Sequence, residues 1–212
     1  MNNGTFDFNL FIAESKETLL NPKSYFSTLK TTGGIVEPLI KAAIYGTIAG
    51  IIAFLWSIVG FGGVSMFGSA VGITLLFTTI IGAVVGLFIG GVILLLISTI
   101  CKGNTDFEAN VRVTASLMVL MPISALLGFT SGINLYLGLI VGLSVQLYSL
   151  WLLYNALIET LKGKPETVKI VSYVLIGLLV LVLLGGMSAR NRASRMFNDY
   201  NKDARELLKD LK

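Results

Sequence analysis

The chain has 212 residues, of which 54% are hydrophobic and only 13% charged, and its formal net charge at pH 7 is +4. Because soluble domains usually carry about one quarter charged residues, this composition excludes an ordinary soluble globular protein. The chain has no histidine and a single cysteine, Cys101, which excludes an intrachain disulfide, the usual His/Cys metal sites and Ser–His or Cys–His catalysis. We therefore expect a protein that is not an enzyme, with no catalytic residue, cofactor or metal site. Its modest positive charge suits anionic lipid head groups rather than nucleic acid.

Residues 1–35 are predicted to form an interfacial N-terminal segment. Apolar residues recur there at spacings of three and four over residues 7–20, which predicts an amphipathic helix. Asn21 and Pro22 are typical of the cap and the first position of a helix, so a second short helix follows, with Tyr25, Phe26 and Leu29 on one face. Both helices are too short to cross a bilayer. They either lie in the plane of the interface or pack against the protein's own spans.

Three long runs without a charged residue define the membrane domain, residues 36–188. They cover Ala42–Cys101 (60 residues), Val113–Ile158 (46 residues) and Ile170–Ala189 (20 residues). Since a bilayer-spanning helix needs about 20 apolar residues, the first two runs hold two spans each and the last holds one. We therefore predict an all-α polytopic membrane protein with five transmembrane helices, near residues 39–59, 72–98, 113–127, 133–157 and 170–186.

Residues 189–212 are predicted to form a charged, amphipathic C-terminal helix, because apolar residues recur at helical spacing: Phe197, Tyr200, Ala204, Leu207 and Leu211. Basic residues indicate the orientation of the spans. The N-terminal segment and the loops at 102–112 and 159–169 carry nine Lys or Arg, including those at the adjoining helix ends, whereas the connections near 60–71 and 128–132 carry none. This predicts a cytoplasmic N-terminus and a C-terminus outside. The seven basic residues of the tail favour the opposite side for the C-terminus.

Glycines at four-residue spacing mark helix faces that another helix can approach closely. The second predicted span carries Gly82, Gly86 and Gly90, and the fourth carries Gly138 and Gly142. Two uses of the first of these faces remain open: self-association, or packing inside the chain against the first or fourth span. The five glycines are therefore candidate helix-packing or oligomerisation residues.

Charged residues near the ends of the predicted spans are candidate interaction residues. Glu37 and Lys41 stand one turn apart at the start of the first span, in the order that favours an i,i+4 ion pair. They serve either as a structural anchor, with their charged ends reaching the lipid head groups, or as a pair that binds a partner. The loop after the second span adds the candidates Lys102, Phe107 and Arg112.

Two residues inside the predicted spans are unusual for a lipid environment. Pro122 is predicted to kink the third span near Met118, either as a hinge or only to fit the bundle. Gln146 brings an amide into the fourth span, where an interhelical hydrogen bond or a transport pathway would satisfy it. No Lys, Arg, Asp or Glu lies deep in a predicted span, which disfavours ion-coupled transport.

Three stretches follow one another along the N-terminal segment and the first half of the membrane domain: LLNPKSYFSTLK, VEPLIKAAI and LISTICKGNTDFEANVRVTASLMVLMP. They resemble, in turn, the pre-membrane segment, the start of the first span, and the second-span exit, loop and third span of the YIP family, the Ypt/Rab-interacting five-span membrane proteins, in its prokaryotic branch. In the last stretch Gly103, Phe107 and Pro122 stand in the family's order. The resemblance covers about residues 18–185 and implies a cytoplasmic N-terminus with the C-terminus across the membrane.

The resemblance also bears on partners, because eukaryotic relatives bind prenylated Rab-type GTPases and one another in vesicle traffic. This sequence has no Asp-Leu-Tyr-Gly-Pro motif before the first span, and Glu37-Pro38 is the nearest match, which argues against a GTPase partner. We expect an integral protein of a prokaryotic cytoplasmic membrane that acts through helix–helix assembly and protein or lipid interaction, in membrane organisation or a trafficking-like role. Its expected partners are membrane lipids and a second copy or other membrane proteins. The alternatives are a permease or channel for a small or lipid-like solute, with its opening near Pro122 and Gln146, and a lipid-binding protein.

Overall fold

The computed structural model describes residues 6–60, 69–183 and 185, and the regular elements in these ranges are helices. Five helical segments are long and apolar enough to cross a membrane: Val36–Val59, Leu76–Ile100, Phe107–Ile133, Leu135–Glu159 and Pro165–Leu183. The predicted all-α fold with five spans is therefore confirmed. The connection at 61–68 and the tail predicted as a helix at 189–212 lie outside the described residues.

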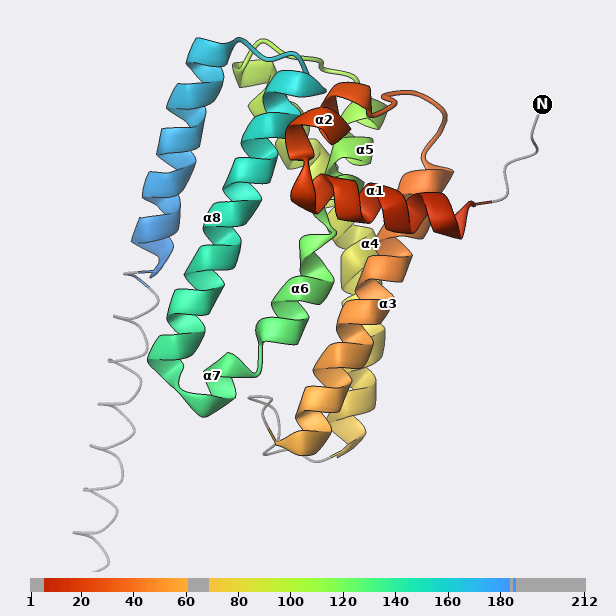
Figure 1. The fold of residues 1–212 in the computed structure, drawn as a ribbon, viewed down its shortest axis with the longest axis vertical. Helices are drawn as coiled ribbons and strands as arrows, with labels where there is room; N and C mark the ends of the chain where they lie inside the picture. Colours follow the sequence, from red (N-terminus) through yellow and green to blue (C-terminus); the bar gives the residue numbers. More distant parts are fainter. Residues whose placement is uncertain (1–5, 61–68, 184, 186–212) are drawn as a thin grey trace, which may run out of the picture. The chain divides into compact units, whose positions relative to one another are not determined.

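The chain divides into two compact units, residues 1–172 and 173–212, and the boundary falls within the last span. The first unit holds all the labelled helices (Figure 1): α1 (Phe8–Leu20), α2 (Pro22–Thr28), α3 (Val36–Val59), α4 (Ser69–Ile100), α5 (Phe107–Leu117), α6 (Leu120–Leu127), α7 (Thr130–Ile133) and α8 (Leu135–Glu159). Helices α5, α6 and α7 together make the third span.

The two short helices before the first span begin close to the predicted residues, but the side chain of Asn21 makes no capping hydrogen bond to α2. The Asp7 carboxylate caps α1 by accepting hydrogen bonds from the first backbone N–H groups of the helix, at 2.9 and 3.1 Å. Pro22 is the first residue of α2, where its missing N–H would have had no partner within the helix. The proline therefore begins α2 without removing a hydrogen bond that the helix would otherwise make.

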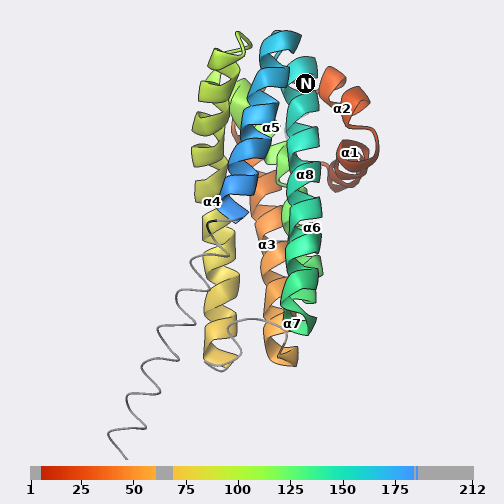
Figure 2. The ribbon, with the colours of Figure 1, turned by 90° about the vertical axis from the view of Figure 1, so that its left-hand side faces the viewer.

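Helices α1 and α2 pack against the protein's own spans, which is one of the two alternatives left open above. Figure 2 shows both helices beside α8, on the side away from α4. The Tyr148 hydroxyl donates to the carbonyl of Leu19, and the Thr160 hydroxyl donates to that of Phe26 at 2.5 Å. The apolar faces of the two helices are buried through Phe11, Tyr25 and Phe26.

The first two spans, α3 and α4, approach each other closely through glycines of α3. A Cβ atom placed on Gly46 would lie 2.5 Å from the Cβ of Ala83, and one on Gly50 would lie 3.3 Å from the carbonyl oxygen of Leu76. Between membrane helices, where lipid is as apolar as the side chains, such small residues permit close backbone contact. This glycine pair was not among the predicted packing residues, although its four-residue spacing equals that of the glycines on the second span.

The third span is interrupted where α5 ends at Leu117 and α6 begins at Leu120. Pro122 explains the break, because its ring clashes with the carbonyl four residues earlier and offers that carbonyl no N–H. The carbonyl in question, that of Met118, accepts instead from the N–H of Met121 at 2.9 Å. The kink predicted near Met118 is therefore present.

Trp56 connects the far half of α3 to the end of α6. Its indole N–H donates to the carbonyls of Ala125 and Leu126, at 3.1 and 3.2 Å, and its ring lies 5.2 Å from that of Phe129. The last carbonyls of a helix lack the usual donors within the helix. The carbonyl of Ala125 also accepts from the N–H of Gly128 at 3.2 Å, and the tryptophan adds a donor that lipid could not supply. This contact holds α6 against α3 below the break.

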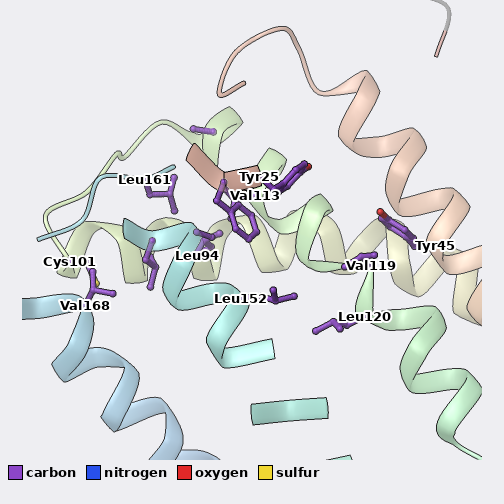
Figure 3. Packing of buried hydrophobic residues seen from close by; sticks show 14 of the residues in the cluster. Tyr25, Tyr45, Leu94, Cys101, Val113, Val119, Leu120, Leu152, Leu161 and Val168 are labelled. Atoms are coloured by element: carbon purple, nitrogen blue, oxygen red, sulfur yellow. The ribbon is translucent and has the colours of Figure 1, made fainter. Parts of the chain in front are cut away.

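One buried cluster joins residues that are far apart in the sequence (Figure 3): Tyr25, Tyr45, Leu94, Cys101, Val113, Val119, Leu120, Leu152, Leu161 and Val168. The loops after α4 and α8 close over its end, since Asn104 donates its N–H to the carbonyl of Leu161 and Lys164 donates to that of Cys101, at 2.6 and 2.8 Å. Burial raises the pKa of the Cys101 thiol. Elsewhere large apolar side chains of the spans are exposed, as lipid-facing helices require.

Replacement of Gly46 by alanine should destabilise the protein, because the added Cβ would overlap Ala83 of α4. Overpacking of this kind costs about 1–3 kcal/mol. The matched control is Gly142→Ala on α8, where a Cβ meets nothing within 4 Å among the described residues. Thermal unfolding of the detergent-purified variants should show a lower midpoint for Gly46→Ala alone, and equal midpoints would contradict the close α3–α4 contact.

Candidate functional site

Five charged side chains from three helices meet at the end of the bundle where α1 and α2 lie. Glu14 comes from α1, Glu37 and Lys41 from α3, and Glu108 and Arg112 from α5. Four ion pairs, all between 2.6 and 3.1 Å, join them into one chain of alternating charge, here called the charge network. Three carboxylates thereby surround two cations at the edge of the apolar spans.

Lys41 is the first of the two buried cations. Its Nζ lies 2.6 Å from Glu14 Oε2 and 2.8 Å from Glu37 Oε1, and its side chain is only 7% exposed. The ion pair expected between Glu37 and Lys41 is therefore present. The expectation that Lys41 reaches the lipid head groups is wrong, because α1 lies across the start of α3 and supplies a carboxylate to the ammonium group instead.

Arg112 is the second buried cation, with a side chain 5% exposed. Its guanidinium binds Glu37 Oε2 at 3.0 Å, Glu108 Oε1 at 3.1 Å and the carbonyl oxygen of Gly34 at 2.9 Å. The N–H of Gly34 in turn donates to Glu108 at 2.6 Å. Gly33 and Gly34 have φ of 129° and 91°, a region that favours glycine. The backbone of Gly34, just before the first span, is therefore part of the charge network.

Tyrosine hydroxyls lie beside the charges. The hydroxyls of Tyr25 and Ser116 are 2.8 Å apart, and those of Tyr45 and Ser15 are 2.7 Å apart. Burial raises the pKa of Tyr25, although the nearby ammonium group of Lys41 opposes the rise. These groups are therefore neutral hydrogen-bonding partners that complete a polar layer around the network.

The charge network is suited to a structural role, because its ion pairs hold α1, α3 and α5 together. Every charged group in it binds at least one group of opposite charge, and in the described ranges no cluster of His, Cys, Asp or Glu could hold a metal ion. Sequence analysis identified Glu37, Lys41 and Arg112 but missed Glu14 and Glu108. The i,i+4 spacing of Glu108 and Arg112 could have identified Glu108. No sequence pattern marked Glu14, because its partner Lys41 is 27 residues away.

The glycine face predicted on the second span divides into two parts. A Cβ atom placed on Gly82 or Gly86 would meet no described heavy atom within 4 Å, whereas one on Gly90 would lie 2.8 Å from the Cγ2 atom of Thr114. Among the described residues, Gly82 and Gly86 therefore do not pack against the first or fourth span, contrary to that alternative. Of the three glycines, only Gly90 makes a close helix contact within the described part of the chain, and this contact is with Thr114 of α5.

The remaining candidates lie apart from the network. Gly138 packs tightly against Ser131 of α7, while a Cβ atom placed on Gly142 would have no described neighbour within 4 Å. Lys102 is exposed in a left-handed turn with φ of 56°. Phe107 packs against a small buried cluster of α3, α4 and α5 rather than presenting its ring to a partner.

Gln146 lines a cavity of about 480 Å³ beside the break between α5 and α6. The side chains of Gln146 and of its cavity neighbours Ser124 and Ser149 make no hydrogen bond with any other described residue. The interhelical hydrogen bond expected for Gln146 is thus not formed among the described residues. The arrangement places three polar groups around one space near the middle of α8.

Replacement of Lys41 by methionine should destabilise the protein by about 3 kcal/mol, because it leaves two carboxylates without their shared cation. A second change, Glu14→Gln, should then cost less than it does in the wild-type protein. Unfolding in detergent of the two single variants and the double variant gives the coupling free energy, with exposed Lys30→Met as the control. Additive effects of the two changes would show that the Glu14–Lys41 contact is not formed.

Comparison with protein families identifies the wider group to which this arrangement belongs. The family described as Yip1 domain matches residues 16–187, a range that contains α2 to α8 and both buried cations. No curated protein and no solved structure matches the chain significantly. The match covers most of the chain and agrees with the resemblance found in its motifs and with its five apolar helices. The chain is therefore a member of the Yip1 family of integral membrane proteins.

Proposed function

We propose that this Yip1-family protein acts without catalysis, by pairing with a second copy of itself through the outer face of α4. The contrast between the two sides of this helix carries the proposal. Its inner side is buried against α3 and α5 through Ala83, Leu87 and Leu94. On its outer side Gly82 and Gly86 have open space among the described residues.

The outer face has the composition of a helix-pairing surface. Val85, Ile89 and Ile93 follow the glycines at helical spacing and are each about half exposed, at 49%, 56% and 52%. A partner backbone can approach over the glycines while its side chains pack against these apolar ridges. Because the pattern runs along a single helix, the same face on a second copy complements it, as a two-fold interface requires.

The inner contacts support this role by fixing the face in place. Gly46 and Gly50 of α3 hold α4 at close range, and α5 packs against the same helix. A rigid helix loses little conformational freedom on association, which favours binding. The charge network joins α3 to α5, and both of these helices pack against α4.

Cysteine crosslinking in native membranes tests the proposed pairing. On a Cys101→Ser background, Val85→Cys should form disulfide-linked dimers on mild oxidation, because Val85 borders the glycine face. The matched control is Leu87→Cys, two residues away but fully buried inside the chain, which should form none.

Gly86→Leu in the Val85→Cys protein should abolish the dimer. A Cβ atom placed on Gly86 meets no described heavy atom of its own chain within 4 Å, so folding should be retained, with an unchanged elution volume and melting temperature in detergent. Equal crosslinking with and without Gly86→Leu, or crosslinking to a different protein only, would contradict self-association through this face.

We also propose that the N-terminus faces the cytoplasm, on the strength of the basic residues that gather at that end of the spans. On the Cys101→Ser background, Lys23→Cys in α2 and Ile133→Cys at the end of α7 place exposed thiols at opposite ends of the bundle. An impermeant maleimide should label Ile133→Cys in intact cells, and Lys23→Cys only after permeabilisation. The reverse pattern would overturn the orientation.

A further inference from the structure

The cavity beside the helix break is an open groove bordered by four membrane spans, in which Gln146 and Ser124 are exposed and Ser149 is half-buried. Its wall is formed by α3, α4, the residues on both sides of the α5–α6 break, and α8. The volume of about 480 Å³ falls within the range of about 300–1,000 Å³ that small-molecule sites occupy. The break itself contributes Leu117, Met118, Leu120 and Met121 to the wall, so the kink at Pro122 shapes the space.

Three polar side chains meet this space without a partner in the described part of the chain. Gln146 and Ser149 come from α8 and Ser124 from α6. An amide offers two donors and an acceptor, and each hydroxyl offers a donor and an acceptor. At membrane depth, polar groups left without a hydrogen bond carry a substantial free-energy penalty, so an occupant that bonds to them is favoured.

The rest of the wall limits the chemistry of the occupant. None of the lining residues is charged, and most are apolar, among them Ala49, Ala53 and Val145. A charged head group would find no counter-charge here, and charge inside the membrane is costly when unpaired. The occupant therefore combines neutral hydrogen-bonding groups with a hydrocarbon chain.

We propose that this cavity binds one uncharged membrane lipid of the diacylglycerol type. Its hydroxyl and ester carbonyl groups would bond to Gln146, Ser124 and Ser149, and its hydrocarbon would lie along the alanine and methionine wall. The site is separate from the outer face of α4 and does not depend on pairing through that face. It gives the protein a lipid-binding surface near the middle of α8.

Photolabelling tests the site with a defined probe. The full chain, reconstituted in phosphatidylcholine vesicles, is irradiated with a diacylglycerol that carries a diazirine in one acyl chain, and labelled peptides are identified by mass spectrometry. Labels should map to the break and to α8 near Gln146. Gln146→Leu should lower the yield about three- to tenfold, the effect of losing one or two neutral hydrogen bonds on an equilibrium constant.

Two controls separate this site from ordinary lipid contact. Ser144→Leu changes a polar residue of the same helix that bonds to its own backbone, at 2.9 Å from the carbonyl oxygen of Ile140, and lies outside the cavity; it should leave the labelling unchanged. A phosphatidylcholine probe with the same diazirine chain should not label the cavity peptides above the level of other lipid-facing peptides. Equal labelling by both probes would overturn the proposal.

A second variant removes the space without removing its polar groups. Ala53→Phe fills the cavity from α3 and should also abolish labelling by the diacylglycerol probe. Unchanged labelling in both Gln146→Leu and Ala53→Phe, with melting temperatures equal to that of the wild type, would overturn the site. Rapid reaction of Gln146→Cys with an impermeant thiol reagent, on the Cys101→Ser background, would also overturn it by showing a water-filled path.

Discussion

Two cations placed at the end of an apolar bundle cannot remain unpaired, and the arrangement of the first unit follows from this requirement. Lys41 and Arg112 are both almost fully buried, where an isolated charge would be strongly destabilising. Their carboxylate partners come from α1, α3 and α5. Each cation has one partner on its own helix and gains its second only when α1 crosses the start of α3 and α5 stands beside it.

Below this charged end, packing follows a different physical principle. The spans have no hydrophobic driving force for association in lipid, and their contacts are made by small residues and by hydrogen bonds to helix ends. Gly46 and Gly50 bring α3 against α4, and Trp56 bonds to carbonyls in the last turn of α6. One end of the bundle is thus held by charge, and the remainder by close backbone contact.

The sequence predicted the features that depend on neighbours along the chain. The spans follow from long uncharged runs, the start of α2 from Asn21 and Pro22, and the break in the third span from the local geometry of a proline. The third span begins at Phe107, earlier than expected, and Arg112 in this stretch pairs both with Glu108 one turn away and with Glu37. The spacing of Glu108 and Arg112 is a local signal for the first pair, but no local pattern could reveal the second, since Arg112 and Glu37 are 75 residues apart.

The glycine faces and Gln146 also depend on contacts between distant parts of the chain, which local sequence patterns do not reveal. Equal spacing on the first and second spans gave no sign that one stripe packs inward and the other remains open. The amide of Gln146 indicated a need for a partner, but the cavity that surrounds it arises from the displacement of α6 at the break. Each outcome depends on how whole helices are placed relative to one another. Residue spacing within one helix carries no information about that placement.

The sequence positions of the network residues have a consequence for biosynthesis. Glu14 and Glu37 both precede Lys41 along the chain, so the first span emerges with the partners of its cation already made. Arg112 and its neighbour Glu108 follow two spans later, and Arg112 then binds the second oxygen of Glu37. Each of the two spans begins with one carboxylate and one cation on the same helix, so each can enter the bilayer as a neutral pair, and the third then gains a second partner from a span that is already in place.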